Sequence, residues 1–142
     1  LIMKSSQRNQ NHIIFVEKGE NVMETLTEYC VTHGIRNGKV SGIGAVEKIN
    51  MGAFDITSKQ YVQSTILDVR ELVSFQGNVT LKDGQPFIHA HAIVGTHDLD
   101  IKGGHMFECT VAVVGEFIIT EIDTNISRKI DETIGLATMC PQ

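Results

Sequence analysis

The stretch Pro86-Phe87-Ile88-His89-Ala90-His91-Ala92-Ile93-Val94 carries the main indication of fold and function. Its apolar and β-branched residues predict a buried β-strand. Successive side chains of a strand point to opposite faces, so His89 and His91 share one face. Burying two imidazoles side by side is unfavourable unless each nitrogen finds a partner. A divalent cation is one such partner, and carboxylates, carbonyls or buried water are the alternatives.

His105 is the third candidate ligand, because it follows a Gly103-Gly104 pair. The two glycines indicate either a turn or a close backbone approach that brings His105 toward the strand. Three protein ligands with an open fourth position are typical of reactive zinc sites. We therefore predict a metal site formed by His89, His91 and His105. The remaining histidines are expected at the surface or at a helix end, not as ligands: His12, His33 and His97.

Strand patterns surround this site on both sides. The turn Lys82-Asp83-Gly84-Gln85 predicts a hairpin between a strand over residues 72–81 and the histidine strand. Gly42 and Gly44 lie within a further apolar run and indicate a bulge or a close backbone approach. The tail over residues 127–136 is expected to form a short turn or a helical piece. Other strands are predicted over residues 12–17, 39–46, 49–54, 61–67 and 106–122, with a hairpin around Thr57-Ser58-Lys59.

One helix is predicted after Asn21, whose side chain can cap the first turn. Val22, Leu26 and Tyr29 recur at helical spacing, and Gly34 provides the C-terminal stop. A single helix among about seven strands does not match the alternation of a parallel α/β sheet. The chain is therefore predicted to be α+β, with a mainly antiparallel sheet and one principal helix packed on it.

Composition limits the domain count and the class of partner. The 142 residues predict one domain over residues 12–142, with residues 1–11 as a disordered leader or a remnant of a longer start. The formal net charge of −5 and the absence of a basic run disfavour electrostatic binding to nucleic acid. Apolar runs are too short for a membrane span, and three cysteines do not form a disulfide framework. A cytoplasmic protein is expected.

Several short motifs occur in an order and spacing that match a known domain family. They are Gly19-Glu20, His33-Gly34-Ile35, residues 40–46, 71–79 and 83–91, Gly103-Gly104-His105, residues 116–121, Arg128, Asp131 and Gly135-Leu136. Together they resemble the plant-and-prokaryote-conserved (PPC) domain in its stand-alone prokaryotic form. The resemblance extends from about His12 to Leu136.

This resemblance implies a PPC-like α+β fold, a homotrimer, and a metal site, usually zinc, at His89, His91 and His105. In plants the domain is fused to an AT-hook, a short basic arm that enters the DNA minor groove, and stand-alone relatives are described as DNA-binding. No Arg-Gly-Arg-Pro arm occurs in this sequence. Direct DNA binding is therefore doubtful here, and contact through protein partners is the other route to a regulatory role.

A cation held by three neutral histidines can lower the pKa of bound water toward about 7 and supply hydroxide. Glu116 is the candidate for one of three roles: a fourth ligand, a hydrogen-bond partner of a ligand, or a general base. Glu121 is expected on the other face of the same strand, in contact with solvent. Asp98 and Asp100 are expected in a solvated loop. Three functions stay open: a metal-binding homotrimer of undetermined activity, a DNA-linked regulator, and a metal-dependent hydrolase or lyase.

Overall fold

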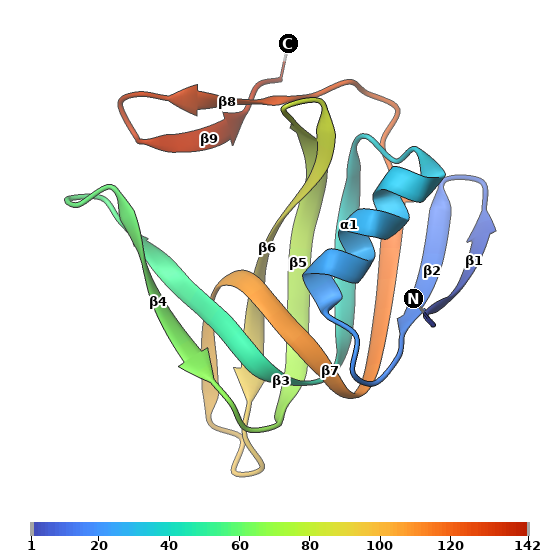
Figure 1. Cartoon of the computed structure of the whole chain (residues 1–142), viewed down its shortest axis with the longest axis vertical. Coiled ribbons are helices and arrows are strands. Elements are labelled where there is room, and N and C mark those ends of the chain that lie inside the picture. Colours follow the sequence, from blue (N-terminus) through green and yellow to red (C-terminus); the bar gives the residue numbers. More distant parts are fainter. Residues whose placement is uncertain (1, 142) are drawn as a thin grey trace.

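Nine strands and one helix make up residues 2–141, the part of the chain that this computed structural model describes (Figure 1). In chain order they are β1 (Lys4–Arg8), β2 (Asn11–Val16), α1 (Val22–His33), β3 (Gly38–Asp55), β4 (Gln60–Ile66), β5 (Arg70–Lys82), β6 (Gln85–Gly95), β7 (Ile101–Glu121), β8 (Arg128–Asp131) and β9 (Leu136–Met139).

The main sheet has seven strands in the order β1-β2-β7-β6-β5-β3-β4, and every neighbouring pair is antiparallel. β7 also pairs with β3 over much of its length. The pairings β3–β5, β5–β6, β6–β7 and β7–β3 thus form a closed ring, and the sheet curves around the core. The α+β fold with a mainly antiparallel sheet and one helix is confirmed.

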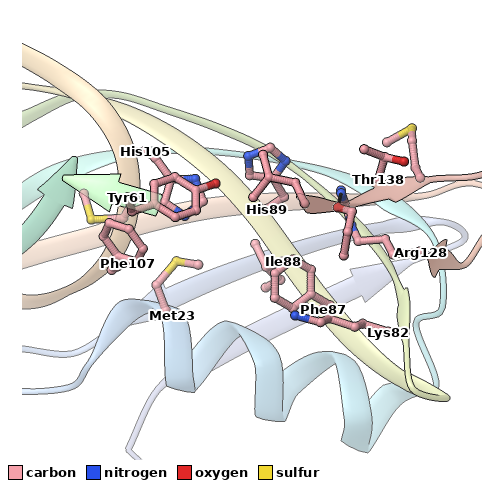
Figure 2. A pocket seen from close by; sticks show the side chains of 14 residues that line it. Met23, Tyr61, Lys82, Phe87, Ile88, His89, His105, Phe107, Arg128 and Thr138 are labelled. Carbon is pink, nitrogen blue, oxygen red and sulfur yellow. Dashed lines mark hydrogen bonds between the residues drawn. The ribbon is translucent and has the colours of Figure 1, made fainter. Parts of the chain in front are cut away.

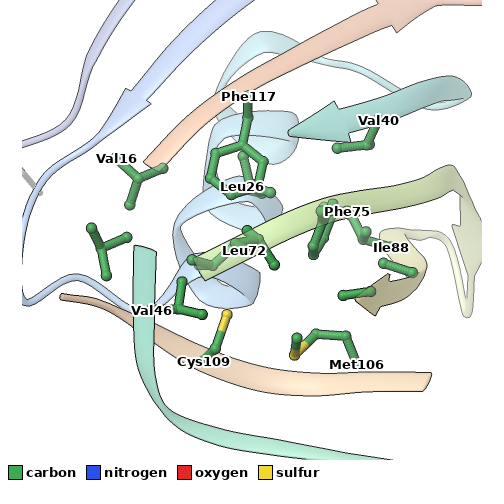
Figure 3. Close-up of a cluster of buried hydrophobic side chains, with 14 of the residues drawn as sticks. Val16, Leu26, Val40, Val46, Leu72, Phe75, Ile88, Met106, Cys109 and Phe117 are labelled. Atoms are coloured by element: carbon green, nitrogen blue, oxygen red, sulfur yellow. The ribbon is translucent and has the colours of Figure 1, made fainter. Parts of the chain in front are cut away.

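The helix α1 begins and ends at the predicted residues. The Asn21 side chain accepts a hydrogen bond from the Glu24 backbone N–H at 3.0 Å, and Gly34 adopts a left-handed conformation with φ 66°. Leu26 and Tyr29 on its buried face join the core formed by the sheet. Phe75 and Phe117 meet edge to face in this core, with ring centroids 5.3 Å apart (Figure 3).

Both ends of the chain differ from the sequence prediction. Residues 1–11 were expected to be a disordered leader, but Lys4–Arg8 forms β1 and pairs with β2. The helical alternative for residues 127–136 was also wrong, because Arg128–Asp131 and Leu136–Met139 form a two-stranded hairpin. All residues of β1 are polar, and β8 and β9 are too short to show a clear alternation. Backbone pairing with a neighbour therefore decides these strands, and hydrophobic periodicity does not reveal them.

Two strands are longer than predicted. The runs over residues 39–46 and 49–54 form one continuous strand, β3, whose register shifts between Gly42 and Gly44. This confirms the predicted irregularity, and a Cβ atom at Gly42 would lie 2.2 Å from the Phe117 ring. β7 begins at Ile101, so it includes the glycine pair and His105. Within residues 2–141, no helix has the length and apolar character needed to cross a bilayer.

We expect Asn21→Ala to lower the free energy of unfolding by about 1 kcal/mol, because the Glu24 backbone N–H loses its acceptor. Asn21→Asp keeps a carboxyl oxygen at the cap and is the matched control, with unfolding close to that of the parent. Urea denaturation followed by circular dichroism measures both. An alanine variant as stable as the aspartate variant would contradict the capping role.

Candidate metal centre

Strand pairing brings the three predicted histidines together. His91 of β6 lies directly opposite His105 of β7 in the antiparallel ladder, and directly opposite residues share one face of a sheet. His89 lies two positions earlier on β6 and shares that face. Ala90 and Ala92 point into the core instead. The strand was expected to be buried on both faces, but its histidine face is only partly buried.

The imidazole rings form a compact triangle. Ring centroids are 5.1 Å apart for His89 and His91, 5.1 Å for His89 and His105, and 5.6 Å for His91 and His105. One ligand nitrogen from each ring lies within 4.8 Å of the other two. Tetrahedral zinc at about 2.1 Å from each nitrogen needs nitrogens about 3.4 Å apart, so small side-chain rotations suffice to close the site.

The ring nitrogens of these histidines make no hydrogen bond to any described residue. The case is clearest at His105, whose Nδ1 is buried without a partner. Tyr61 and Phe107 both pack against this ring, with each centroid 4.6 Å from that of His105. A buried polar atom without a partner is costly. The arrangement therefore fits a ligand for which these nitrogens are the donors.

The glycine pair before His105 acts by close approach and not as a turn. Gly103 and Gly104 are in the extended part of β7, and Gly104 is opposite Ala92. A Cβ atom at Gly104 would lie 2.5 Å from the carbonyl oxygen of Gly52 in β3. Only glycine allows this separation. It lets β7 lie close against β3 at the residue immediately before His105.

Partial burial favours the neutral form of two members of the cluster, His89 and His105. Desolvation, followed by the repulsion of the neighbouring histidines, lowers the pKa of His105 to about 4. Desolvation also lowers the pKa of His89, with further contributions from the Arg128 charge and from His91. Neutral imidazole is the form that binds metals, so protons compete little with a cation for these rings.

Donor type and geometry both fit a divalent transition ion. His89, His91 and His105 would hold it through imidazole nitrogens, the ligands that suit zinc and copper more than magnesium or calcium. His89 and His105 also line a cavity of about 520 Å³ (Figure 2). A site with three protein ligands can thus leave one position for water or a small molecule.

The cavity contains functional candidates that the sequence reasoning missed. Lys82 and Arg128 line one end, and Tyr61 and Phe107 line the end beside His105 (Figure 2). These residues come from four separate strands, so no local spacing indicates that they meet. Arg128 appeared in the sequence only among the motifs of the family resemblance.

The predicted carboxylates lie elsewhere. Glu116 is in the far half of β7, opposite Phe15 of β2, and does not line the cavity beside the histidines. The structure does not bring Glu116 to the three histidines, because eleven further positions along β7 carry it away from His105. Glu121 is partly buried, with Oε1 3.4 Å from His12 Nε2. Asp98 and Asp100 are exposed between β6 and β7, as expected.

His12 was expected at the surface or a helix end and is instead fully buried, with 0% of its surface exposed. Its Nδ1 shares a hydrogen bond of 2.9 Å with the Tyr29 hydroxyl. The prediction for the other two histidines is confirmed: His33 ends α1 and contacts the Tyr29 carbonyl, and His97 is exposed in a loop. Among the described residues, none of these three histidines belongs to the cluster of His89, His91 and His105.

Two of the three cysteines are unsuited to nucleophilic chemistry. Cys30 and Cys109 are buried, and desolvation raises the pKa of each thiol to about 12. Both pack in the core as small apolar side chains, which agrees with the sequence prediction.

Solved structures similar to this chain come from archaea and bacteria. A PPC protein of Pyrococcus horikoshii is 30% identical, with a TM-score of 0.87, 99% of this chain and 96% of that chain covered. A metal-containing protein of Archaeoglobus fulgidus is 26% identical, with a TM-score of 0.89 and 99% of each chain covered. A Bacteroides thetaiotaomicron chain, described as a "putative dna binding protein", shares the fold at 24% identity, with a TM-score of 0.95 and 99% and 98% covered.

No curated protein matches the chain. The sequence profile of the Plants and Prokaryotes Conserved (PCC) domain matches residues 3–123, which is most of the chain. Together with the strand order and the position of the helix, this match identifies the chain as a member of the PCC domain family, also abbreviated PPC.

Proposed function

We propose that this PPC-domain protein binds one divalent transition ion, most simply zinc, through His89, His91 and His105. The observation that carries the proposal is the meeting of three imidazoles whose nitrogens have no partner among the described residues. The metal-containing Archaeoglobus relative supports it independently. The net charge of the three ligands is zero, so the cation would keep its full charge toward the cavity.

Zinc on three histidines supplies a Lewis acid and can acidify a bound water. Hydrolysis or elimination would in addition need a group that accepts a proton near the bound molecule. The cavity lining contains no aspartate or glutamate among the described residues. The residues of this chain therefore favour a protein that binds a ligand at the metal over an enzyme that activates water. A hydrolase or lyase is the less favoured function.

We also propose that the protein is a homotrimer, as the family resemblance implies. A curved face of β2, β3, β5 and β7 supports this, because it exposes large apolar side chains next to a hollow of about 560 Å³. Contiguous exposed apolar surface is typical of association sites. The side chains are Ile13, Ile43, Val73, Val113 and Ile118.

A DNA-linked role is the other candidate, and the description of the Bacteroides relative favours it. The net charge of −5 opposes direct binding, since attraction to phosphates requires clustered lysine and arginine. Any regulatory action would then run through protein partners.

Elemental analysis of the purified protein tests the metal proposal. We expect about one zinc per chain in the parent and almost none in His91→Ala. Loss of a direct ligand should weaken binding by more than about 100-fold, because removal of mere supporting partners already costs 10–100-fold. His91 is exposed, so its removal should leave the fold intact.

His97→Ala is the matched control, because it removes an exposed histidine from the loop that follows the same strand. It should retain the metal content of the parent. Equal zinc in all three proteins would rule out the assigned ligands.

The stability of the metal-free protein should fall as the pH is lowered from about 6.5 to about 4. In this range the unfolded chain, with a histidine pKa of about 6.5, binds more protons than the folded chain, in which the pKa of His105 is about 4. Urea denaturation at pH 7, 6 and 5 measures the slope. His105→Phe should reduce the slope while keeping an aromatic ring packed against Tyr61 and Phe107, and an unchanged slope would refute the assignment.

Substitution of Ile43 tests the assembly. Its side chain is 55% exposed in the middle of the apolar face. Ile43→Lys should convert trimers to monomers, because a buried charge at a subunit boundary is costly. Light scattering after size-exclusion chromatography reads the mass. Ile56→Lys, at an 83% exposed position beyond β3, should leave the mass unchanged, and a trimeric Ile43→Lys would contradict this interface.

A further inference from the structure

One end of the cavity beside the histidines is strongly cationic. Lys82 Nζ lies 4.8 Å and Arg128 Cζ lies 5.4 Å from the centre of the Phe87 ring (Figure 2). None of the cavity's lining residues is acidic, and no described carboxylate forms an ion pair with either cation. In a chain with a net charge of −5, this is a local reversal of sign. It attracts an anion and not a second cation.

Only some of the hydrogen-bond donors of the Arg128 guanidinium are used within the described residues. Its Nε donates to Thr80 Oγ1 at 2.7 Å, one terminal nitrogen donates to the Asn78 side chain at 2.7 Å, and the other donates to the Ala137 carbonyl at 3.2 Å. These bonds use three of the five guanidinium N–H groups. One N–H on each terminal nitrogen is left, which is the number that one oxyanion group accepts from an arginine fork. All three acceptors are neutral, so the charge stays uncompensated.

The same contacts hold the guanidinium in place. Asn78 and Thr80 belong to β5, and Ala137 belongs to β9, so Arg128 is fixed between two elements before any ligand arrives. A guanidinium with restricted motion loses little entropy on binding an anion. Desolvation by partial burial lowers the pKa of Arg128, and the group is charged at every physiological pH.

The rest of the cavity is apolar and suited to a flat molecule. Phe87 and Ile88 line it near the cations, and Met23 and Phe107 line the end beside His105, with His89 between the two ends (Figure 2). Its volume of about 520 Å³ lies within the range of cavities that hold small organic ligands. Aromatic and methionine side chains accept flat rings readily.

We propose that this cavity binds a small aromatic or flat apolar molecule that carries one oxyanion group, a carboxylate or a phosphate. The oxyanion pairs with the two free N–H groups of Arg128, and Lys82 adds a second positive charge. The apolar body then extends past His89 toward Phe107. The inference deepens the metal-site proposal and rests on it, because it assigns a ligand class to the face of that site.

Calorimetric titration of the zinc-loaded protein with 2-naphthoate, 2-naphthyl phosphate and the uncharged 2-naphthamide tests the inference. At least one anion should bind about tenfold or more tightly than the amide, because charge-assisted hydrogen bonds contribute the difference. The anion that binds more tightly shows whether the site prefers a carboxylate or a phosphate. An amide that binds as tightly as both anions would overturn the proposal.

Three variants distinguish the contributions of the Arg128 and Lys82 side chains to anion binding. Arg128→Gln should weaken the preferred anion about tenfold or more, and Lys82→Gln about two- to fivefold, since an exposed point charge contributes less. Lys129→Gln is the matched control, because it removes one charge from the exposed position next to Arg128 and should change the affinity little. An equal loss in Lys129→Gln would show a general charge effect and refute the site. The Lys82 side chain is not among the partners that hold Arg128, so its variant is informative even if Arg128→Gln loosens the β8–β9 hairpin.

Zinc content measured in every sample distinguishes the two proposals. Protein that holds zinc but binds neither anion refutes the ligand class alone. Protein that holds no zinc but binds an anion through Arg128 refutes the metal centre and supports the anion site.

Discussion

The antiparallel pairing of β6 with the start of β7 is the constraint on which the rest of the structure depends. It places His91 opposite His105 while Ala90 and Ala92 face the core. A slip of one residue would turn the histidines inward and the alanines outward, because strand side chains alternate with a period of two. The close contact between Gly104 and Gly52 supports this register from the β3 side. Core and candidate site are therefore specified together.

Two electrostatic features meet on the outer face of this ladder. Desolvation keeps His89 and His105 neutral and available to a cation, while Arg128 adds a positive charge that no described residue neutralises. The same charge contributes to the lowered pKa of His89. An anion bound near Arg128 would offset the repulsion between the guanidinium and a metal ion on the histidines. This is a physical reason to consider metal and anion as one ligand environment.

Local rules predicted the elements whose signal lies within a few residues. Asn21 and Gly34 bound the helix because capping chemistry is local, and Lys82-Asp83-Gly84-Gln85 closes a hairpin for the same reason. The strand β1 escaped prediction because its residues are polar and its order comes from pairing with β2. His12 was misplaced because its burial depends on Tyr29, a helix residue that the chain brings over the sheet.

The sequence by itself determined that the fold is α+β, that one capped helix packs on an antiparallel sheet, and that His89 and His91 share a face. These follow from periods and turns that act over short distances. Only the tertiary structure decided that Glu116 lies far from His105 and that Arg128 reaches Asn78, fifty residues away. Strand register and the path of β7 control these distances, and both arise from the packing of the whole sheet.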